Sequence, residues 1–424
     1  MALSSTPDAE RPPPLNAIRR QFFFTFFVMG ALVPYLPVWL QERGLTRTEI
    51  GQIQALPGIA VLVAPVLLTL LADTRWSNRR TLAVLFAVGG AALAGLLVSW
   101  GFWVIAAVFL VYNLAKTPIA PLQDGLFFRA EADRMATLPP GAPHDPKATY
   151  HRIRAWGTGG FIVAAALITP ALLLGGGIDT VVWAALLGCG LGLANAATLG
   201  TPERAAAQAG DADRPQGSRW SRLPTAAALR QVMRPPLLTF FIAMWLIQFG
   251  VAAYYAFYPL YLTELLALDP VWVGPITNLG VVIELFMIVA FGRLVARFGL
   301  RNVMLLGMVS TVLRFGLLAV FVNVPVAVGL QLIHGLMVLV VHVMPPMFLN
   351  RHAEAAYRNS IQGVYAMLIL GTARALGSWG SGVVADTPWG YPGVFGVAAV
   401  ICAVGGAVLC VPLWRMRGDG PSPT

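Results

Sequence analysis

Ionisable side chains buried in long apolar segments are the strongest chemical signal in this sequence. Between residues 271 and 349 three such segments carry them near their middles: Glu284, Arg314, His334 and His342. A carboxylate, a guanidinium or an imidazole is costly to place in hydrocarbon, so these residue types usually mark a path for ions or for a substrate. Their combination predicts a group that binds and releases a proton inside a membrane.

Glu284 is the predicted proton carrier. Burial and a nearby cation act in opposite directions on a carboxylate, so its proton affinity can change as its neighbours move. We expect Arg314 to be the movable partner and His334 to donate, accept or share the proton. The alternative is a permanent Glu284–Arg314 ion pair that only holds two helices together.

Polar residues on the neighbouring segments are predicted to line a cavity. Gln331, His334 and His342 follow the spacing i, i+3 and i+11, which places them on one stripe of a regular helix. Such a stripe in lipid must face protein or a cavity. Tyr254 and Tyr255 are the deepest tyrosines of an aromatic segment, and we expect them to bind substrate, although aromatic stripes more often serve packing.

Two further cations, Lys116 and Arg374, lie deep in other apolar segments. We expect both to face the cavity and attract an anion such as a carboxylate, with Asn113 one turn from Lys116 on the same surface. The alternative is that they pair with Asp124 or a helix C-terminus, or bind lipid. A second set is predicted to form gating or structural ion pairs: Asp73, Asp124, Arg152 and Arg154.

The elements that carry these residues are predicted to be membrane-spanning helices. The chain has 424 residues, of which 57% are apolar and only 11% charged, whereas soluble domains carry roughly 25% charged residues. Each apolar run can cross about 30 Å of hydrocarbon as a helix. Twelve spans are predicted, at about 17–40, 50–71, 81–99, 102–126, 152–174, 180–199, 236–262, 271–292, 302–322, 325–349, 360–384 and 391–414.

The basic residues predict the orientation of these spans. With the N-terminus inside, 24 Lys and Arg residues fall on the inner side and only Arg43 and Arg47 on the outer side. Both termini are therefore expected in the cytoplasm, and the protein is expected in an inner or plasma membrane. The net charge of +10 is then a topology signal, and no nucleic-acid partner is expected. The three cysteines lie in apolar segments, so neither a disulfide framework nor a metal site is indicated.

The two halves of the sequence repeat each other. Pro37, Trp39 and Leu40 correspond to Pro259, Tyr261 and Leu262 at a constant offset of 222 residues. Six-plus-six repeats are typical of transporters that bind substrate near the midplane between the halves. The repeat predicts an N-terminal half over 1–199, a cytoplasmic linker over 200–235, a C-terminal half over 236–414 and a tail over 415–424.

Specific strings carry a family resemblance. The loop Gly292-x-Leu-x-x-Arg297-x-Gly299-x-Arg301 resembles the loop motif of the major facilitator superfamily, although Ala296 replaces its usual acidic residue. Other strings resemble the phenylpropionate-permease group: Pro121-Leu-Gln-Asp124, Tyr150-His-Arg-Ile-Arg154-Ala-Trp156-Gly157, Ala252-Ala-Tyr254-Tyr255-Ala-Phe257, Gly280-Val-Val-Ile-Glu284, Val312-Leu-Arg314-Phe, Gln331-Leu-Ile-His334 and Gln362-Gly-Val-Tyr365. That group is similar to the lactose-permease type of proton symporters. The resemblance implies the major facilitator fold and a coupling cluster of Glu284, Arg314 and His334.

The sequence therefore predicts a proton-coupled uptake transporter for a small organic solute, with an aromatic or other carboxylic acid favoured. It is expected to act as a monomer, to use the proton gradient without a cofactor, and not to be an enzyme, because no nucleophile–base arrangement or phosphate loop is present. A sugar or nucleoside symporter, a proton-driven efflux antiporter for drugs or metabolites, and a non-transporting sensor are the alternatives. The Gly-Pro pair typical of the antiporters is missing from residues 157–170.

Overall fold

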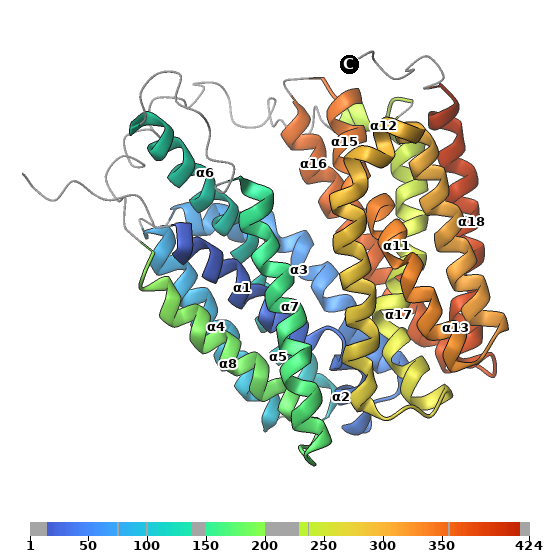
Figure 1. The fold of residues 1–424 in the computed structure, drawn as a ribbon, viewed down its shortest axis with the longest axis horizontal. Coiled ribbons are helices and arrows are strands. Elements are labelled where there is room, and N and C mark those ends of the chain that lie inside the picture. Colours follow the sequence, from blue (N-terminus) through green and yellow to red (C-terminus); the bar gives the residue numbers. More distant parts are fainter. Residues whose placement is uncertain are drawn as a thin grey trace, which may run out of the picture.

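The computed structural model describes residues 15–73, 76–98, 101–137, 149–199, 229–235, 237–354 and 357–415. Every regular element within these ranges is a helix. Two groups of helices lie next to each other in Figure 1, one coloured blue to green and the other yellow to red. Most of the predicted linker, together with residues 1–14 and 416–424 at the ends of the chain, lies outside the described residues.

The N-terminal group is built from long apolar helices. Its elements are α1 (Leu15–Leu32), α2 (Leu36–Glu42), α3 (Arg47–Asp73), α4 (Asn78–Leu97), α5 (Phe102–Lys116), α6 (Ile119–Thr137), α7 (Tyr150–Leu173) and α8 (Thr180–Ala196). The α1 and α2 helices form one span bent by 42°, and Pro37 lies in the first turn of α2. A proline is tolerated there because the first helical amides lack intrahelical partners.

The C-terminal group is less regular. It contains α11 (Leu237–Leu260), η1 (Tyr261–Leu265), η2 (Pro270–Trp272), α12 (Val273–Val320), α13 (Val324–Gly329), η3 (Leu330–Ile333), α14 (His334–Val338), η4 (Leu339–Val343), α15 (Met344–His352), α16 (Arg358–Tyr365), η6 (Ala366–Ala373), α17 (Arg374–Ala385) and α18 (Gly390–Arg415). The 48-residue α12 changes direction at Gly299, whose φ is 76°. A residue without a Cβ adopts this conformation readily, so α12 supplies two successive spans.

The described helices group into twelve segments that follow the predicted spans. Seven of the described helices are long and apolar enough to cross a membrane, or eight when α1 and α2 count as one span. The predicted all-α polytopic membrane fold is confirmed. Three spans differ from the expected regular helices, because each combines α-helical turns with a π-helical segment: η1, η4 or η6.

The two groups touch through glycine-lined contacts between α3 and the α17 span. A Cβ on Gly51 would lie 2.7 Å from the carbonyl oxygen of Ser378, and one on Gly58 would lie 2.5 Å from that of Gly371. Such distances leave no room for a side chain, so glycine lets the two backbones approach closely. On the other side of the interface, Asn278 of α12 donates to the carbonyl oxygen of Ile162 in α7 at 3.1 Å.

Candidate functional site

A buried arginine forms the centre of a polar cluster in the C-terminal group. Arg314, on the second part of α12, is 0% exposed. Its Nη1 lies 2.6 Å from Nδ1 of His334, and its Nη2 donates to Oε1 of Gln331 at 2.9 Å. A guanidinium can only donate, so Nδ1 of His334 must be the acceptor. The neutral imidazole then carries its hydrogen on Nε2.

His334 lies between the arginine and the carboxylate. Its Nε2 is 3.9 Å from Oε2 of Glu284, whose side chain is 28% exposed. The described residues contain no direct ion pair between Glu284 and Arg314, so the expected pairing of these two residues is corrected to a chain of three. The reason is topological: α14 packs against α12 and places the imidazole between the two parts of that helix.

Two of the predicted substrate-binding residues belong to this cluster. The Arg314 guanidinium carbon lies 4.2 Å from the centre of the Tyr254 ring, a cation–π geometry. The Tyr254 hydroxyl lies 3.2 Å from Oε1 of Gln331. Both Tyr254 and Gln331 are buried, and they support Arg314 instead of lining the cavity described next. Tyr255 points elsewhere because successive helical residues are turned by about 100°.

Gln331, His334 and His342 do not form the predicted stripe, because the segment that carries them is not one regular helix. Gln331 lies in a 3-10 segment, His334 begins α14, and His342 lies in the π-helical η4. These changes of winding alter the angle between successive side chains. Gln331 and His334 are buried, whereas His342 is exposed and lies within electrostatic reach of Arg374 and Arg154.

A cavity lies between the two groups and gathers the other predicted binding residues. It is lined by Leu32, Val33, Leu36, Gln54, Pro57, Phe109, Tyr112, Asn113, Lys116, Tyr255, Ala256, Arg374 and Ser378. The α5 helix contributes Asn113 and Lys116, whereas α11 and α17 contribute Tyr255 and Arg374. The structure thus brings together four predicted residues that are far apart in the sequence.

The two cations of this cavity have no acidic partner. Within the described ranges, neither Lys116 nor Arg374 forms an ion pair, and the Arg374 guanidinium carbon lies 5.8 Å from the Tyr255 ring. Both positive charges line the same cavity, so they repel each other. The Asn113 amide donates to the Phe109 carbonyl oxygen at 2.8 Å, which leaves its own oxygen available. Lys116 and Arg374 therefore supply donors and positive charge to the cavity, and Asn113 adds an acceptor.

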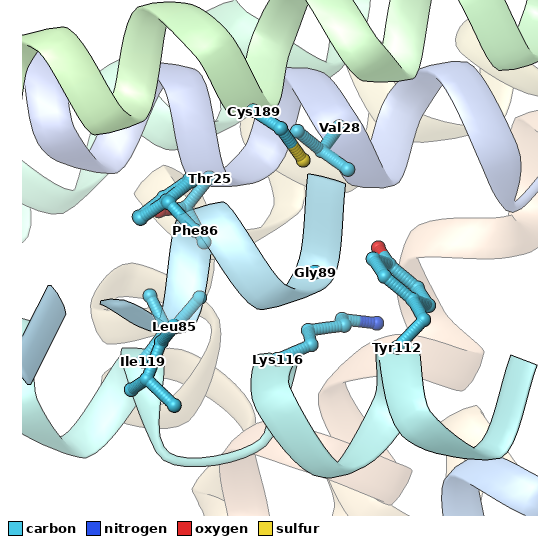
Figure 2. A pocket seen from close by; sticks show the side chains of 9 residues that line it. All are labelled: Thr25, Val28, Leu85, Phe86, Gly89, Tyr112, Lys116, Ile119 and Cys189. Atoms are coloured by element: carbon cyan, nitrogen blue, oxygen red, sulfur yellow. The ribbon is translucent and has the colours of Figure 1, made fainter. Parts of the chain in front are cut away.

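An apolar side pocket adjoins the cavity. Figure 2 shows its lining: Thr25, Val28, Leu85, Phe86, Gly89, Tyr112, Lys116, Ile119 and Cys189. Tyr112 and Lys116 line both spaces, and the amino group of Lys116 points toward Tyr112 in this view. An apolar wall therefore lies next to a charged amine.

The predicted pairing of Asp124 with arginines is replaced by a hydrogen bond. The Tyr150 hydroxyl donates to Oδ1 of Asp124 at 2.8 Å. Burial, and then Asp124 itself, raise the pKa of Tyr150 to about 12, so the hydroxyl keeps the proton that it donates. Arg152 and Arg154 are both exposed and form no ion pair with Asp124, and Arg154 lies over the Phe26 ring at 5.0 Å. The side chain of Asp73, also predicted to form an ion pair, lies outside the described part of the chain.

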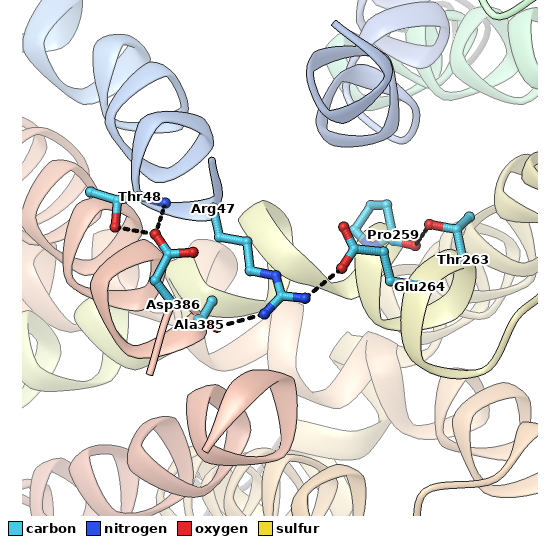
Figure 3. A network of polar contacts seen from close by, with 7 residues as sticks. All are labelled: Arg47, Thr48, Pro259, Thr263, Glu264, Ala385 and Asp386. Atoms are coloured by element: carbon cyan, nitrogen blue, oxygen red, sulfur yellow. Dashed lines mark hydrogen bonds and ion pairs between the residues drawn. The ribbon is translucent and has the colours of Figure 1, made fainter. Parts of the chain in front are cut away.

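Sequence reasoning missed a polar network that joins the two groups of helices. It lies at the end of the molecule where α17 ends and α18 begins. We call it the latch, and Figure 3 shows it: Arg47, Thr48, Glu264, Ala385 and Asp386. Arg47 of α3 donates to Glu264 at 2.9 Å and to the Ala385 carbonyl oxygen at 3.0 Å. The amide and hydroxyl of Thr48 donate to Asp386 at 2.8 and 2.6 Å.

A usable signal for the latch was present in the sequence. In the predicted topology, Arg43 and Arg47 are the two basic residues on the side of the membrane with few positive charges. Both are paired, Arg47 in the latch and Arg43 with Asp179 at 2.5 Å. Two arginines on a side with few basic residues are a signal that each has a specific acidic partner.

Comparisons with known proteins place the chain among transporters. A model of the MFS_1 like family matches residues 16–390. The probable 3-phenylpropionic acid transporter of Escherichia coli (strain K12) is 28% identical over 363 residues, which cover 84% of this chain and 87% of that protein. The putative nucleoside transporter YegT of the same strain is 26% identical over 383 residues, covering 87% and 84%. A mutant of the nucleoside transporter NupG has a similar fold, with a TM-score of 0.77 at 20% identity over 93% of this chain and 99% of that one.

Proposed function

The chain belongs to the MFS_1 like family, and from this premise we propose that it is a proton-coupled symporter that takes up a small organic acid. Membership and relatives make it a multi-pass secondary transporter with a small-molecule substrate, not an enzyme. Proton coupling, uptake and the class of substrate are the proposed steps. The observation that carries them is the separation of one carboxylate in a buried proton-handling cluster from two unpaired cations in the cavity.

Proton coupling is assigned to the chain Glu284–His334–Arg314. Nε2–H of His334 faces the Glu284 carboxylate at 3.9 Å, which is longer than a hydrogen bond of about 3 Å. A small movement of the helices toward each other would form that bond and favour the ionised carboxylate. Separation would favour the protonated acid. Arg314 fixes the tautomer of His334 through Nδ1, so it acts on the carboxylate through the imidazole.

Uptake is the direction that we propose, in the orientation that the basic residues favour. With both termini in the cytoplasm, the latch closes the outer end, and the side of Glu284 and His342 faces inward. Protonated Glu284 would accompany substrate loading from outside. Substrate and proton would then leave on the cytoplasmic side as Glu284 meets His334. The proton gradient supplies the energy, and the proposal needs no cofactor.

An acid is favoured as substrate by the charges of the cavity. Lys116 and Arg374 offer donors without acidic partners, and ionised donors form the stronger hydrogen bonds with carboxylates. Phe109, Tyr112 and Tyr255 add aromatic surface. The relative whose name refers to 3-phenylpropionic acid supports the same class.

Transport assays in proteoliposomes test this proposal, with labelled 3-phenylpropionate as the first probe. Glu284→Gln should abolish accumulation driven by a proton gradient but keep exchange of internal for external substrate. Arg358→Gln, which removes an exposed charge on α16, is the control and should behave as the wild type. Accumulation by Glu284→Gln at the wild-type level would contradict the role of this carboxylate.

Nucleoside symport is the second candidate, because a relative and a structurally similar protein carry that name. A neutral nucleoside would bind in the same cavity but leave both cations without a counter-charge. Gradient-driven accumulation of uridine, with no uptake or competition by organic acids, would favour it over acid transport.

A further inference from the structure

The residues that line the cavity carry two positive charges and no negative charge. Lys116 brings one positive charge and Arg374 another, and no carboxylate among the described residues pairs with either. Glu284, the acidic residue of the neighbouring cluster, is already approached by His334. Unpaired charges in a membrane-embedded space are costly, so the cavity lacks negative charge that a ligand can supply.

The two cations also lie on opposite groups of helices. Lys116 ends α5 in the N-terminal group, and Arg374 begins α17 in the C-terminal group. An ammonium has three donors and a guanidinium five. Lys116 also lines the side pocket, whereas Arg374 lines only the cavity among these two spaces. A ligand that enters both spaces can therefore present one acceptor group to each cation.

The space next to the cations is apolar and aromatic. Phe109, Pro57 and Ala256 contribute to the cavity wall, and Leu85, Phe86 and Ile119 line the side pocket beside Lys116. A ligand that fits has an apolar body with acidic groups on it. Binding sites commonly combine such apolar walls with a few polar groups that set orientation.

We propose that the substrate is an organic dianion with two separate carboxylates, one held by Lys116 and the other by Arg374, so that it bridges the two halves of the transporter. This inference rests on the proposed acid transport and narrows it from acids in general to diacids. The bridge offsets the repulsion between the two cations. A monoanion leaves one of them without a counter-charge.

The test compares acids that differ only in the second charge. Purified full-length protein is titrated with benzene-1,3-dicarboxylate and with its monoamide, 3-carbamoylbenzoate, and thermal stabilisation and competition for transport are measured. The diacid should act at a concentration at least about tenfold lower, the effect expected for one charge-assisted hydrogen bond. Equal potency of the two compounds would overturn the inference.

Variants link the preference to the two residues. Lys116→Gln and Arg374→Gln should each reduce the preference for the diacid to less than about threefold, whereas Lys116→Arg, which keeps the charge, should retain most of it. Arg358→Gln is the matched control for loss of one positive charge outside the cavity. A full preference in both Gln variants would overturn the inference.

Three further outcomes test this inference and separate it from the proposed function. Stronger binding of phenyl phosphate, which carries both charges on one group, would overturn the two-carboxylate bridge. Gradient-driven uptake of the monoacid, lost in Glu284→Gln and equal to that of the diacid, would leave the proposed function intact and reject the diacid. Absence of binding and transport for every acid would reject both.

Discussion

The polar cluster around Arg314 and the cavity around Lys116 show two ways to hold a cation in a membrane protein. Arg314 donates to His334 and Gln331 and lies against the Tyr254 ring. Lys116 and Arg374 have no acidic partner in the described residues, and the Arg374 guanidinium lies near the Tyr255 ring. Arg314 has no acidic partner in the described residues either, and its Nε lacks an acceptor, but both of its Nη groups donate within the protein. The cations of the cavity leave their donors available.

This difference assigns different tasks to residues of similar chemistry. A hydrogen-bonded cluster can control the protonation of Glu284 without any ligand, because its hydrogen bonds fix donors and acceptors. Lys116 and Arg374, in contrast, are stabilised only when a ligand with a negative charge binds. The comparison therefore predicts opposite signs for mutations that remove a positive charge from the two places.

Arg314→Met should have the largest effect on the folded protein. It leaves Nδ1 of His334 as a buried acceptor without a donor, which costs about 1–3 kcal/mol. Oε1 of Gln331 loses one of its two donors but keeps the Tyr254 hydroxyl. We expect a marked loss of thermal stability in detergent together with loss of transport. Arg314→Lys keeps the charge but cannot form the same fork, so its stability should be intermediate. A melting temperature equal to that of the wild type would show that the cluster does not stabilise the fold.

His334→Phe should affect both coupling and stability, because it also leaves the buried Nη1 of Arg314 without its acceptor. A ring of similar shape keeps the packing but can neither accept from Arg314 nor donate to Glu284. Gradient-driven accumulation should fall about tenfold, which corresponds to the loss of one hydrogen bond to a charged group. Substrate exchange should remain.

The matched variant for this position is His334→Gln, whose side chain has both an acceptor and a donor. It should recover part of the accumulation that His334→Phe loses. If both variants accumulate substrate as the wild type does, His334 is not the link between Arg314 and the carboxylate.

Lys116→Met tests the other half of the comparison. Removing an uncompensated cation should stabilise the substrate-free protein by about 1 kcal/mol, although binding of acids is weakened. Thermal unfolding without substrate and with saturating acid measures both effects. Arg358→Met, on the exposed surface, should change neither. Destabilisation of the empty protein by Lys116→Met would mean that the lysine has a structural partner.

Much of this architecture could be predicted from the sequence because the signals are local. Apolar runs fix the spans, and buried charges such as Glu284 and Arg314 stand out from them. The placement of Lys116 and Arg374 in one cavity also agrees with the expectation that they face it. The roles proposed for these residues in coupling and binding stay predictions.

The orientation of individual side chains could not be predicted so well. Tyr254 and Tyr255 are neighbours of the same type, and only the packing of α11 decides that Tyr254 supports Arg314 while Tyr255 lines the cavity. The π-helical η4 shifts His342 away from the expected stripe. Contacts of the latch join residues more than 200 positions apart, as in Arg47–Glu264, and no local pattern encodes that pairing.

The latch is expected to contribute less free energy than the polar cluster around Arg314 or the cavity around Lys116. Glu264→Gln removes an ion pair at 2.9 Å in which the Arg47 side chain is 38% exposed, so its loss should cost only about 0.2–1 kcal/mol. That energy shifts an equilibrium between two conformations by about 1.4- to 5-fold. Because the pair joins the two groups, the population open at the latch end should rise while overall stability changes little.

Spin labels on Glu42→Cys and Pro388→Cys, both at exposed positions of that end, can report the shift as a longer distance between the labels. Glu49→Gln is the matched control, since Glu49 accepts from Thr46 at 2.8 and 2.9 Å within its own half. A longer distance in both variants would indicate a general effect of lost charge. A change confined to Glu264→Gln would show that the exposed ion pair between the halves biases the conformational equilibrium.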